Sequence, residues 1–228
     1  MQNELGQPIG ESLEWEGAKP PPSVVLKGQY CRIEPLTPAH AEDLFDATQA
    51  DPDGGNWTYL FEDPIQSASE FESWAIKASQ SKDPLFHAII SAETGKAVGY
   101  ATYMRIDPVM GVIEIGNIHM SPALQGTRAS TEAMYLMMKQ AFALGYRRYE
   151  WKCDSLNAPS RRAAERLGFS FEGIFRQALV YKGRNRDTAW FSVIGSEWPA
   201  LQKAFEAWLA PRNFGASGEQ LAKLQDFR

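Results

Sequence analysis

The possible folds of this chain are restricted most by a series of three strand-like segments followed directly by a long helical segment. Residues 85–91, 97–106 and 112–120 are separated by two short turns, at 93–96 and 107–111, which predicts an antiparallel meander. The apolar spacing then becomes that of a helix over 127–144, and 149–153 again has the pattern of a strand. A strand, a helix and a further strand in this order predict a β-α-β crossover beside the meander.

The remaining predicted elements complete a mixed α/β domain. Three consecutive prolines within residues 1–23 favour an extended arm, which Trp15 would anchor on the domain surface. The predicted organisation is therefore an N-terminal arm at 1–23, one domain at 24–210 and a polar C-terminal tail at 211–228. The other predicted elements are strands at 24–35, 170–181 and 188–194 and helices at 38–49, 67–79, 160–167 and 198–209, with Thr37 capping the first helix and Ser196 the last.

Charge and cysteine content argue against several classes of protein. A net charge of −5 does not suit a protein that binds duplex nucleic acid, which needs clustered Lys and Arg. The two cysteines, Cys31 and Cys153, have no close Cys or His neighbour that predicts a metal site, and buried thiols are typical of a reducing compartment. The N-terminus does not resemble a signal peptide, and no apolar run approaches the ~20 residues that cross a bilayer. We therefore expect a cytoplasmic protein that binds neither nucleic acid, nor membrane, nor metal.

The segment 117–132 carries the clearest functional pattern. A strand ends at Ser121-Pro122, a short polar turn follows, and a helix begins near Thr127. The first N–H groups of a helix have no intrahelical acceptor and lie at the positive end of its dipole, so small residues at this point let a pyrophosphate approach. An ordinary capped turn explains the same residues. Neither GxGxxG nor GxxxxGK[ST] occurs, which argues against dinucleotide oxidoreductases and P-loop NTPases.

This stretch resembles the cofactor motif of the GNAT acetyltransferase superfamily: Gln or Arg, two residues, Gly, one residue, then Gly or Ala. Gln125 matches the first position and Ser130 replaces the last small residue, whereas Arg128 departs from the motif by replacing the middle Gly. A second block, Asn157-Ala-Pro-Ser160 followed by Leu167-Gly-Phe169 and Glu172-Gly173, resembles the superfamily's downstream segment. The resemblance covers roughly residues 25–195 and is nearest to the ribosomal-protein-alanine type (RimJ/RimL-like), in which Ser160 takes the place of a Tyr later in the helix.

The resemblance implies a mostly antiparallel sheet flanked by helices, in which a splayed strand pair holds the acyl-CoA. It also implies that acetyl-CoA is the co-substrate. Backbone groups of the splayed strand would orient the thioester, an oxyanion-type arrangement of donors, and Asn157 would bind the pantetheine arm. The implied cofactor residues are Ile118, His119, Met120, Gln125, Gly126, Thr127, Arg128, Ala129, Ser130, Thr131 and Asn157.

Two residues are candidates for catalysis. Ser160 would protonate the departing thiolate as a general acid, although Ser and Asn157 at a helix start also suit capping. Glu114 lies mid-strand between two isoleucines, which makes it a candidate general base or simply an outward-facing residue. His119 titrates near neutrality but is equally explained as a packed side chain.

The loop 51–64 is the candidate acceptor side, since Trp57, Tyr59 and Phe61 stand there among acidic residues that suit a cationic amine. Packing of the same aromatic residues on the core is the alternative. The predicted activity is transfer of an acetyl group to a primary amine, either a protein N-terminus or a small molecule. Transfer of a longer acyl group and non-catalytic acyl-CoA sensing remain alternatives, and a homodimer is left open.

Overall fold

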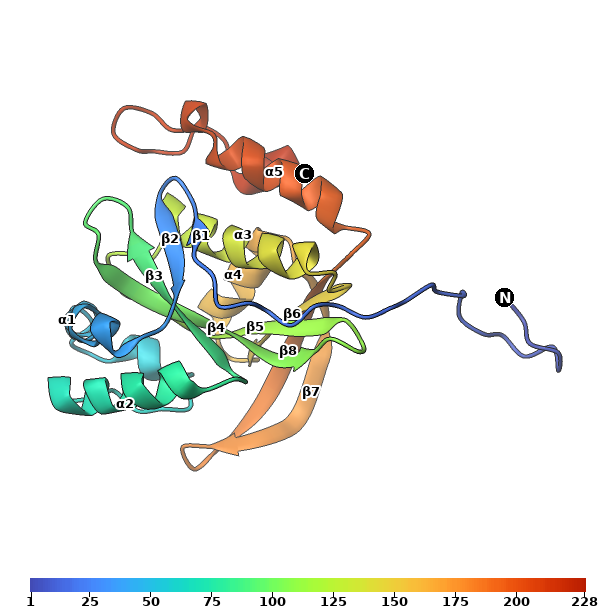
Figure 1. Ribbon diagram of the computed structural model, residues 1–228, viewed down its shortest axis with the longest axis horizontal. Helices are drawn as coiled ribbons and strands as arrows, with labels where there is room; N and C mark the ends of the chain where they lie inside the picture. Colours follow the sequence, from blue (N-terminus) through green and yellow to red (C-terminus); the bar gives the residue numbers. More distant parts are fainter.

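The computed structural model describes residues 1–228 and has an eight-stranded sheet at its centre (Figure 1). The strand order is β1-β2-β3-β4-β5-β6-β8-β7, and all neighbours are antiparallel except β5 and β6. The predicted meander and crossover are confirmed. The strands are β1 (Leu26–Lys27), β2 (Cys31–Pro35), β3 (Leu85–Ser91), β4 (Ala97–Asp107), β5 (Val112–Met120), β6 (Arg148–Asp154), β7 (Ser170–Tyr181) and β8 (Arg184–Ile194).

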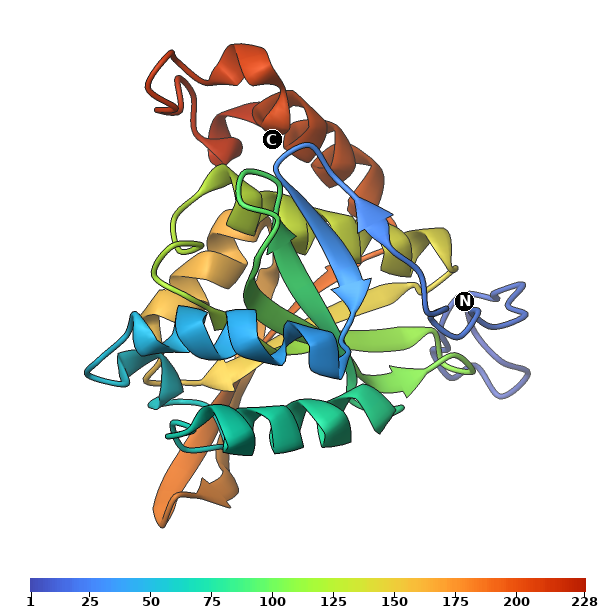
Figure 2. The same cartoon turned by 60° about the vertical axis from the view of Figure 1, so that its left-hand side comes forward.

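Helices cover both faces of the sheet (Figure 2). The pair α1 and α2 packs on one face through β3 and β4, whereas α3 and α4 pack on the other through β5, β6 and their neighbours. The last helix, α5, packs on the outer side of α3. No helix has the length and apolar composition needed to span a bilayer. The helices are α1 (Ala41–Gln49), α2 (Ala68–Gln80), α3 (Arg128–Ala143), α4 (Ala158–Leu167) and α5 (Trp198–Leu209), with short 3-10 turns η1 (Pro38–His40), η2 (Gly55–Trp57), η3 (Pro211–Asn213) and η4 (Leu224–Phe227).

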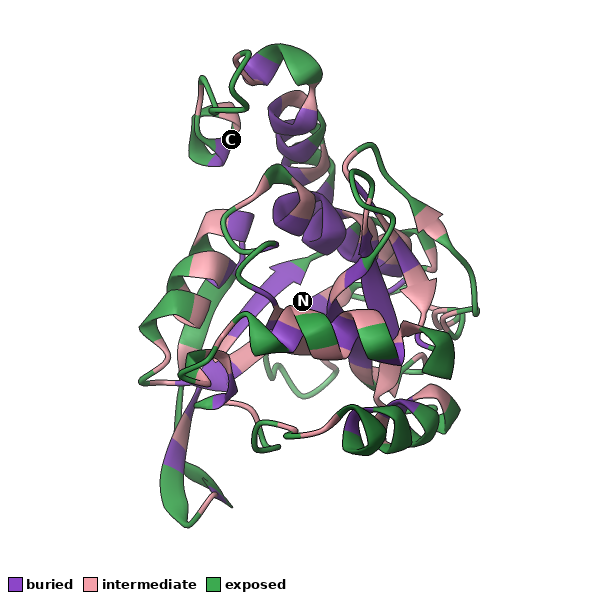
Figure 3. Ribbon diagram, turned by 90° about the vertical axis from the view of Figure 1, so that its left-hand side faces the viewer, coloured by how far each residue is buried: buried purple, intermediate pink, exposed green.

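The main core lies between the sheet and the layer of α3, α4 and α5 (Figure 3). Ile113 and Ile115 of β5 point into it, as their alternation along the strand predicts. Met137 and Met138 of α3 are fully buried against them, so these methionines are core residues. The core therefore fixes the position of α3 relative to β5. These two elements flank residues 121–127, the turn at which the sequence predicts pyrophosphate binding (the phosphate turn).

The parallel pair β5 and β6 separates after a few residues. Their pairing runs from Val112 opposite Arg148 to Ile115 opposite Trp151, and β5 then continues to Met120 without that partner. A bulge on the other side of β5 redirects the strand, because Asn117 has a φ of 45° and the β4 register shifts there. The end of β5 thus has an unpaired backbone edge, as the splayed-strand expectation requires.

The ends of the domain differ from expectation in three places. The predicted strand 24–35 is instead a hairpin, since the backbone turns at Gln29–Tyr30 and returns as β2. The helix α5 begins after Glu197, not Ser196, and has no side-chain cap. The predicted polar tail is folded onto α5, with Leu224 fully buried. At the other end Trp15 Nε1 donates to Val109 O at 2.6 Å, which anchors the extended arm.

The strand β7 forms the edge of the sheet and pairs only with β8. Its exposed side chains include Phe175 and Val180. The register with β8 shifts between Phe175 and Leu179, where Gln177 has a φ of 50°. Asp187 Oδ1 accepts the Gln177 N–H at 2.7 Å, so the irregular backbone of this edge is held from within the hairpin.

Candidate active site

The turn between β5 and α3 presents backbone donors that have no partner. Thr127 caps α3, since its Oγ1 accepts the Ser130 N–H at 3.1 Å. The N–H groups of Gly126, Arg128 and Ala129 have no acceptor within the chain. Gly126 has a φ of 70°, a left-handed conformation that side chains rarely adopt. Capping therefore accounts for one donor and leaves an anion-binding arrangement at the positive end of the helix dipole.

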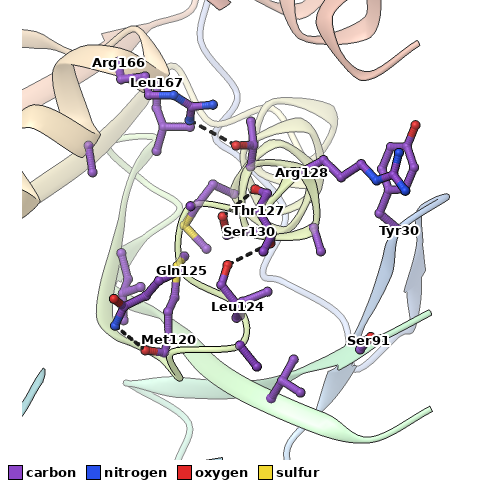
Figure 4. A pocket seen from close by; sticks show the side chains of 18 of the residues that line it. Tyr30, Ser91, Met120, Leu124, Gln125, Thr127, Arg128, Ser130, Arg166 and Leu167 are labelled. Atoms are coloured by element: carbon purple, nitrogen blue, oxygen red, sulfur yellow. Dashed lines mark hydrogen bonds between the residues drawn. The ribbon is translucent and has the colours of Figure 1, made fainter. Parts of the chain in front are cut away.

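The side chain of Gln125 points back to the strand instead of toward the helix. Its Nε2 donates to Met120 O at 3.0 Å (Figure 4). The same nitrogen donates to Asn56 Oδ1 at 2.7 Å. Asn56, in the loop before α2, also donates to Met120 O at 3.4 Å. The Met120 carbonyl is thus occupied by side chains. Gln125 connects the phosphate turn with the predicted acceptor loop.

Arg128, the departure from the motif, does not obstruct the turn. Its guanidinium carbon lies 4.4 Å from the ring centroid of Tyr30 and 5.3 Å from that of Phe214. Figure 4 shows the side chain extended away from the turn and stacked beside Tyr30. The backbone of the turn accordingly stays accessible despite the loss of the motif's glycine.

At the start of α4, Asn157 caps the helix and Ser160 does not. Asn157 is the N-cap, with Oδ1 accepting the Ser160 N–H at 3.0 Å, while its Nδ2 has no partner in the chain. Ser160 is the third residue of the helix, and its Oγ accepts from Trp151 Nε1 at 3.0 Å. The Ser160 hydroxyl proton is thus not used in capping.

One large cleft, with a volume of about 1430 Å³, joins these features. It exceeds the ~300–1,000 Å³ of a typical small-molecule pocket, as an elongated cofactor requires. Among the predicted residues, the cleft is lined by Ile118, His119, Met120, Gln125, Gly126, Thr127, Arg128, Ala129, Ser130, Thr131, Asn157, Ser160 and Tyr59. The residues that the sequence placed far apart are therefore brought to one site.

The cleft also includes residues that sequence reasoning missed. They come from the β1–β2 turn, the β3–β4 turn, the end of α4 and the C-terminal segment, whose residues had no recognisable motif. Arg166 is the one charged residue among them with a direct tie to the phosphate turn, donating to Thr131 Oγ1 at 3.0 Å. Its place two residues before Gly168-Phe169 was the only available signal. The missed lining residues include Tyr30, Arg166, Trp208 and Phe214.

Glu114 does not line the cleft. Its carboxylate accepts from Lys152 Nζ at 2.8 Å and lies 3.5 Å from Arg105 Nε. Burial raises the pKa of Glu114, and the Lys152 ammonium opposes this rise. Because Glu114 lies outside the cleft and its Oε2 is held in an ion pair, this placement does not support the predicted general-base role.

Of the three aromatic residues expected beside the acceptor, only Tyr59 lines the cleft. Trp57 is buried against His119, with ring centroids 4.8 Å apart. Phe61 lies 5.7 Å from the Tyr181 ring and beneath the Arg186 guanidinium. The loop is therefore held by its aromatic side chains, as the alternative explanation proposed, and still brings Tyr59 to the cleft.

His119 lies at the boundary between the cleft and the α1–α2 face. Its ring stacks on Tyr100 with centroids 5.2 Å apart and planes at 12°. The side chain is 2% exposed, and its Nε2 has no hydrogen-bond partner. Burial lowers the pKa of His119 to about 4, which outweighs the opposing effect of Asp51. The imidazole is thus neutral at physiological pH.

We expect acid to destabilise the fold through His119 and His87, whose pKa values burial lowers to about 4. Below an unfolded-state pKa of about 6.5 the unfolded chain binds protons that the folded protein excludes, so stability falls as the pH drops from ~6.5 toward ~4. Each histidine should remove roughly 2 kcal/mol of unfolding free energy between about pH 7 and pH 5. Urea unfolding of the wild type and of His87→Gln at both values measures this. An equal loss in the two proteins contradicts the assignment.

Comparison with known proteins agrees with this geometry. Residues 31–170 match the family described as the acetyltransferase (GNAT) domain. A GCN5-related N-acetyltransferase from Brucella melitensis is 52% identical, with a TM-score of 0.92, over 94% of this chain and 98% of that one. A probable GNAT-family acetyltransferase from Chromobacterium violaceum is 38% identical, with a TM-score of 0.78, over 85% and 99%. No match was found among the curated proteins.

RimJ from Mycobacterium smegmatis, solved with CoA-disulfide, shares only the fold, at 18% identity and a TM-score of 0.63 over 74% of this chain and 84% of that one. The family match and the two more similar structures carry the assignment. The chain therefore belongs to the GNAT family of acetyltransferases.

Proposed function

We propose that this acetyltransferase transfers the acetyl group of acetyl-CoA to a primary amine, either the N-terminal amine of a protein or a small-molecule amine. The observation that carries the proposal is the position of Ser160 and the phosphate turn in one cleft, with three backbone donors lacking acceptors. The co-substrate supplies an acetyl thioester. The residues of the chain position it and offer a proton to the departing sulfur.

The acceptor side suits a cation. The loop before α2 exposes Asp53 and Glu62, which flank Tyr59 in the sequence, and neither carboxylate has a partner within the chain, so both attract an ammonium group. An α-amine has a pKa of about 7.7–8.0, against about 10.4 for a lysine side chain, so a useful fraction is neutral without a strong base. Because Glu114 is held in an ion pair, an α-amine or another weakly basic amine fits this site better than lysine.

A RimJ/RimL-like specificity for protein N-termini is the finer form of this proposal. It is supported by the block around Asn157 and Ser160 and by the fold shared with RimJ. The apolar lining residues Trp151, Leu167 and Met134 favour transfer of a longer acyl chain as the second candidate.

Calorimetric titration with acetyl-CoA, followed by thiol release with a panel of amines, tests the function. The panel pairs short peptides that have free N-termini with N-acetylated peptides whose only amine is lysine, and adds small-molecule amines. We expect binding and preferential turnover of α-amines. Absence of binding contradicts the proposal, binding without turnover of any amine favours a sensor, and faster turnover of longer acyl-CoAs favours the second candidate.

We expect Ser160→Ala to lower kcat by about 100-fold, within the range for loss of a positioned acid. The acetyl-CoA dissociation constant should change by less than about twofold, because Asn157 retains the helix cap. Steady-state kinetics and calorimetry on the same samples separate the two quantities. Ser160→Thr, which keeps a hydroxyl, is the matched control. An unchanged kcat in Ser160→Ala would show that Ser160 is not the general acid and only accepts the hydrogen bond from Trp151.

A further inference from the structure

Aromatic and arginine side chains form a continuous ladder across the first turn of α3. The Arg166 guanidinium lies 5.1 Å from the Trp208 centroid, and the Trp208 and Phe214 rings are 5.1 Å apart. Phe214 is 6.1 Å from Tyr30, which stacks with Arg128 at 4.4 Å. The members of this aromatic–arginine ladder, all lining the cleft, are Arg166, Trp208, Phe214, Tyr30 and Arg128.

The C-terminal segment that carries Phe214 is held in place by specific bonds. Asn213 Nδ2 donates to Trp208 O at 3.0 Å, and its Oδ1 accepts the Ala222 N–H at the same distance. Trp208 Nε1 donates to Gln220 at 3.1 Å. Tyr30 is fixed from the other side, because its hydroxyl donates to Leu209 O at 3.1 Å. The ladder is therefore a built wall of the cleft.

The two arginines of the ladder have no carboxylate partner. No acidic side chain lies within ion-pair distance of Arg128 or Arg166. The Arg166 guanidinium is bonded only to the Thr131 hydroxyl, on the first turn of α3. Guanidinium groups without a carboxylate partner bind phosphate oxygens well, and aromatic and guanidinium faces stack on nucleobases.

The order of groups along the cleft identifies which part of the cofactor meets the ladder. Ser160 and the splayed strands mark the thioester end, and the free N–H groups of α3 mark the pyrophosphate. The remaining part is the adenosine with its 3′-phosphate, an aromatic base beside an anion. We propose that the aromatic–arginine ladder, with Phe214 supplied by the C-terminal segment, binds this nucleotide half and makes the enzyme select CoA thioesters over shorter pantetheine thioesters. This rests on the proposed function.

The test compares Phe214→Leu with the wild type in the full-length chain. Leucine keeps the apolar packing of the segment but removes the ring that meets Arg128 and Tyr30. We expect calorimetry to show CoA bound about tenfold more weakly, the loss of one stacking contact. Competition by 3′-phospho-ADP should weaken to the same extent, while the KM for S-acetylpantetheine stays unchanged. Leu221→Ala, an exposed change in the same segment outside the cleft, is the control.

Hydrogen exchange gives a second measurement. Amides of residues 213–222 should gain protection on addition of CoA and not on addition of pantetheine. If the wild type binds CoA but Phe214→Leu binds it equally well, or the segment gains no protection, the ladder does not hold the nucleotide. If the wild type fails to bind CoA, the proposed function itself fails. Thermal unfolding of each variant excludes a general loss of structure.

Discussion

Replacement of Ser130 by Glu should weaken acetyl-CoA binding by about 100-fold or more. Ser130 is the third residue of α3 and lines the cleft beside the N–H groups that have no acceptor. A carboxylate at this position stands where the pyrophosphate must bind, and unit charges about 4 Å apart near a protein surface interact by roughly 4 kcal/mol. Even with screening, about 2.7 kcal/mol remains, which corresponds to a hundredfold change in affinity.

The helix itself should tolerate the charge, because Glu three residues after a Thr cap completes a capping box. Ser130→Gln has nearly the same shape without the charge and is the matched control. Calorimetry at low salt should show a much larger loss for Glu than for Gln, and added salt should narrow the difference. Equal affinities for the two variants would contradict the placement of the phosphate site.

Replacement of Glu132 by Ala should be the most destabilising single change outside the apolar core. The Glu132 carboxylate is buried in α3 and accepts N–H bonds from Gln29, Tyr30 and Cys31, at 2.7, 2.6 and 2.8 Å. It fixes the β1–β2 hairpin against the helix, and a Cβ on Gly28 would overlap it. Three donors would lose their acceptor, at about 1–3 kcal/mol for each one that stays buried.

Allowing for water that enters the gap, we expect a loss of about 3 kcal/mol or more, and a melting temperature lower by roughly 6–12 °C. Differential scanning calorimetry measures the shift. Glu72→Ala removes an exposed glutamate from the middle of α2 and should stay within about 0.5 kcal/mol of the wild type. If the two variants melt together, the buried carboxylate does not hold the hairpin.

The elements were predictable wherever periodicity and caps agreed. The bounds of β3, β5, β7 and α5 match the predicted ranges, and α3 begins one residue after the Thr127 cap. The prediction of a single strand over 24–35 was wrong because the segment turns back on itself. That turn is held by Glu132, a residue about a hundred positions later. Local sequence carries no signal for such a long-range bond.

In the candidate site, too, the parts that depend on local sequence were predictable and the parts that depend on long-range contacts were not. The phosphate turn and the Asn157–Ser160 block lie on short segments whose geometry follows from local caps, so they could be located. Alternation along β5 puts Glu114 on the face opposite Ile113 and Ile115, but its pairing with Lys152 of β6 is a long-range contact for which the local sequence carries no signal. The C-terminal wall was missed because tertiary packing, through Leu224 and Asn213, folds a polar sequence onto α5.

The irregular edge strand β7 has a consequence for how the protein behaves at high concentration. An exposed strand edge that carries phenylalanine and valine is a template on which other chains add. Continuous pairing needs a regular row of amide and carbonyl groups, and the left-handed backbone of Gln177, which Asp187 of β8 holds in place, interrupts that row. Straightening this kink, for example with a β-branched residue in place of Gln177 and loss of the Asp187 carboxylate, would turn a protected margin into a site for fibrous self-association.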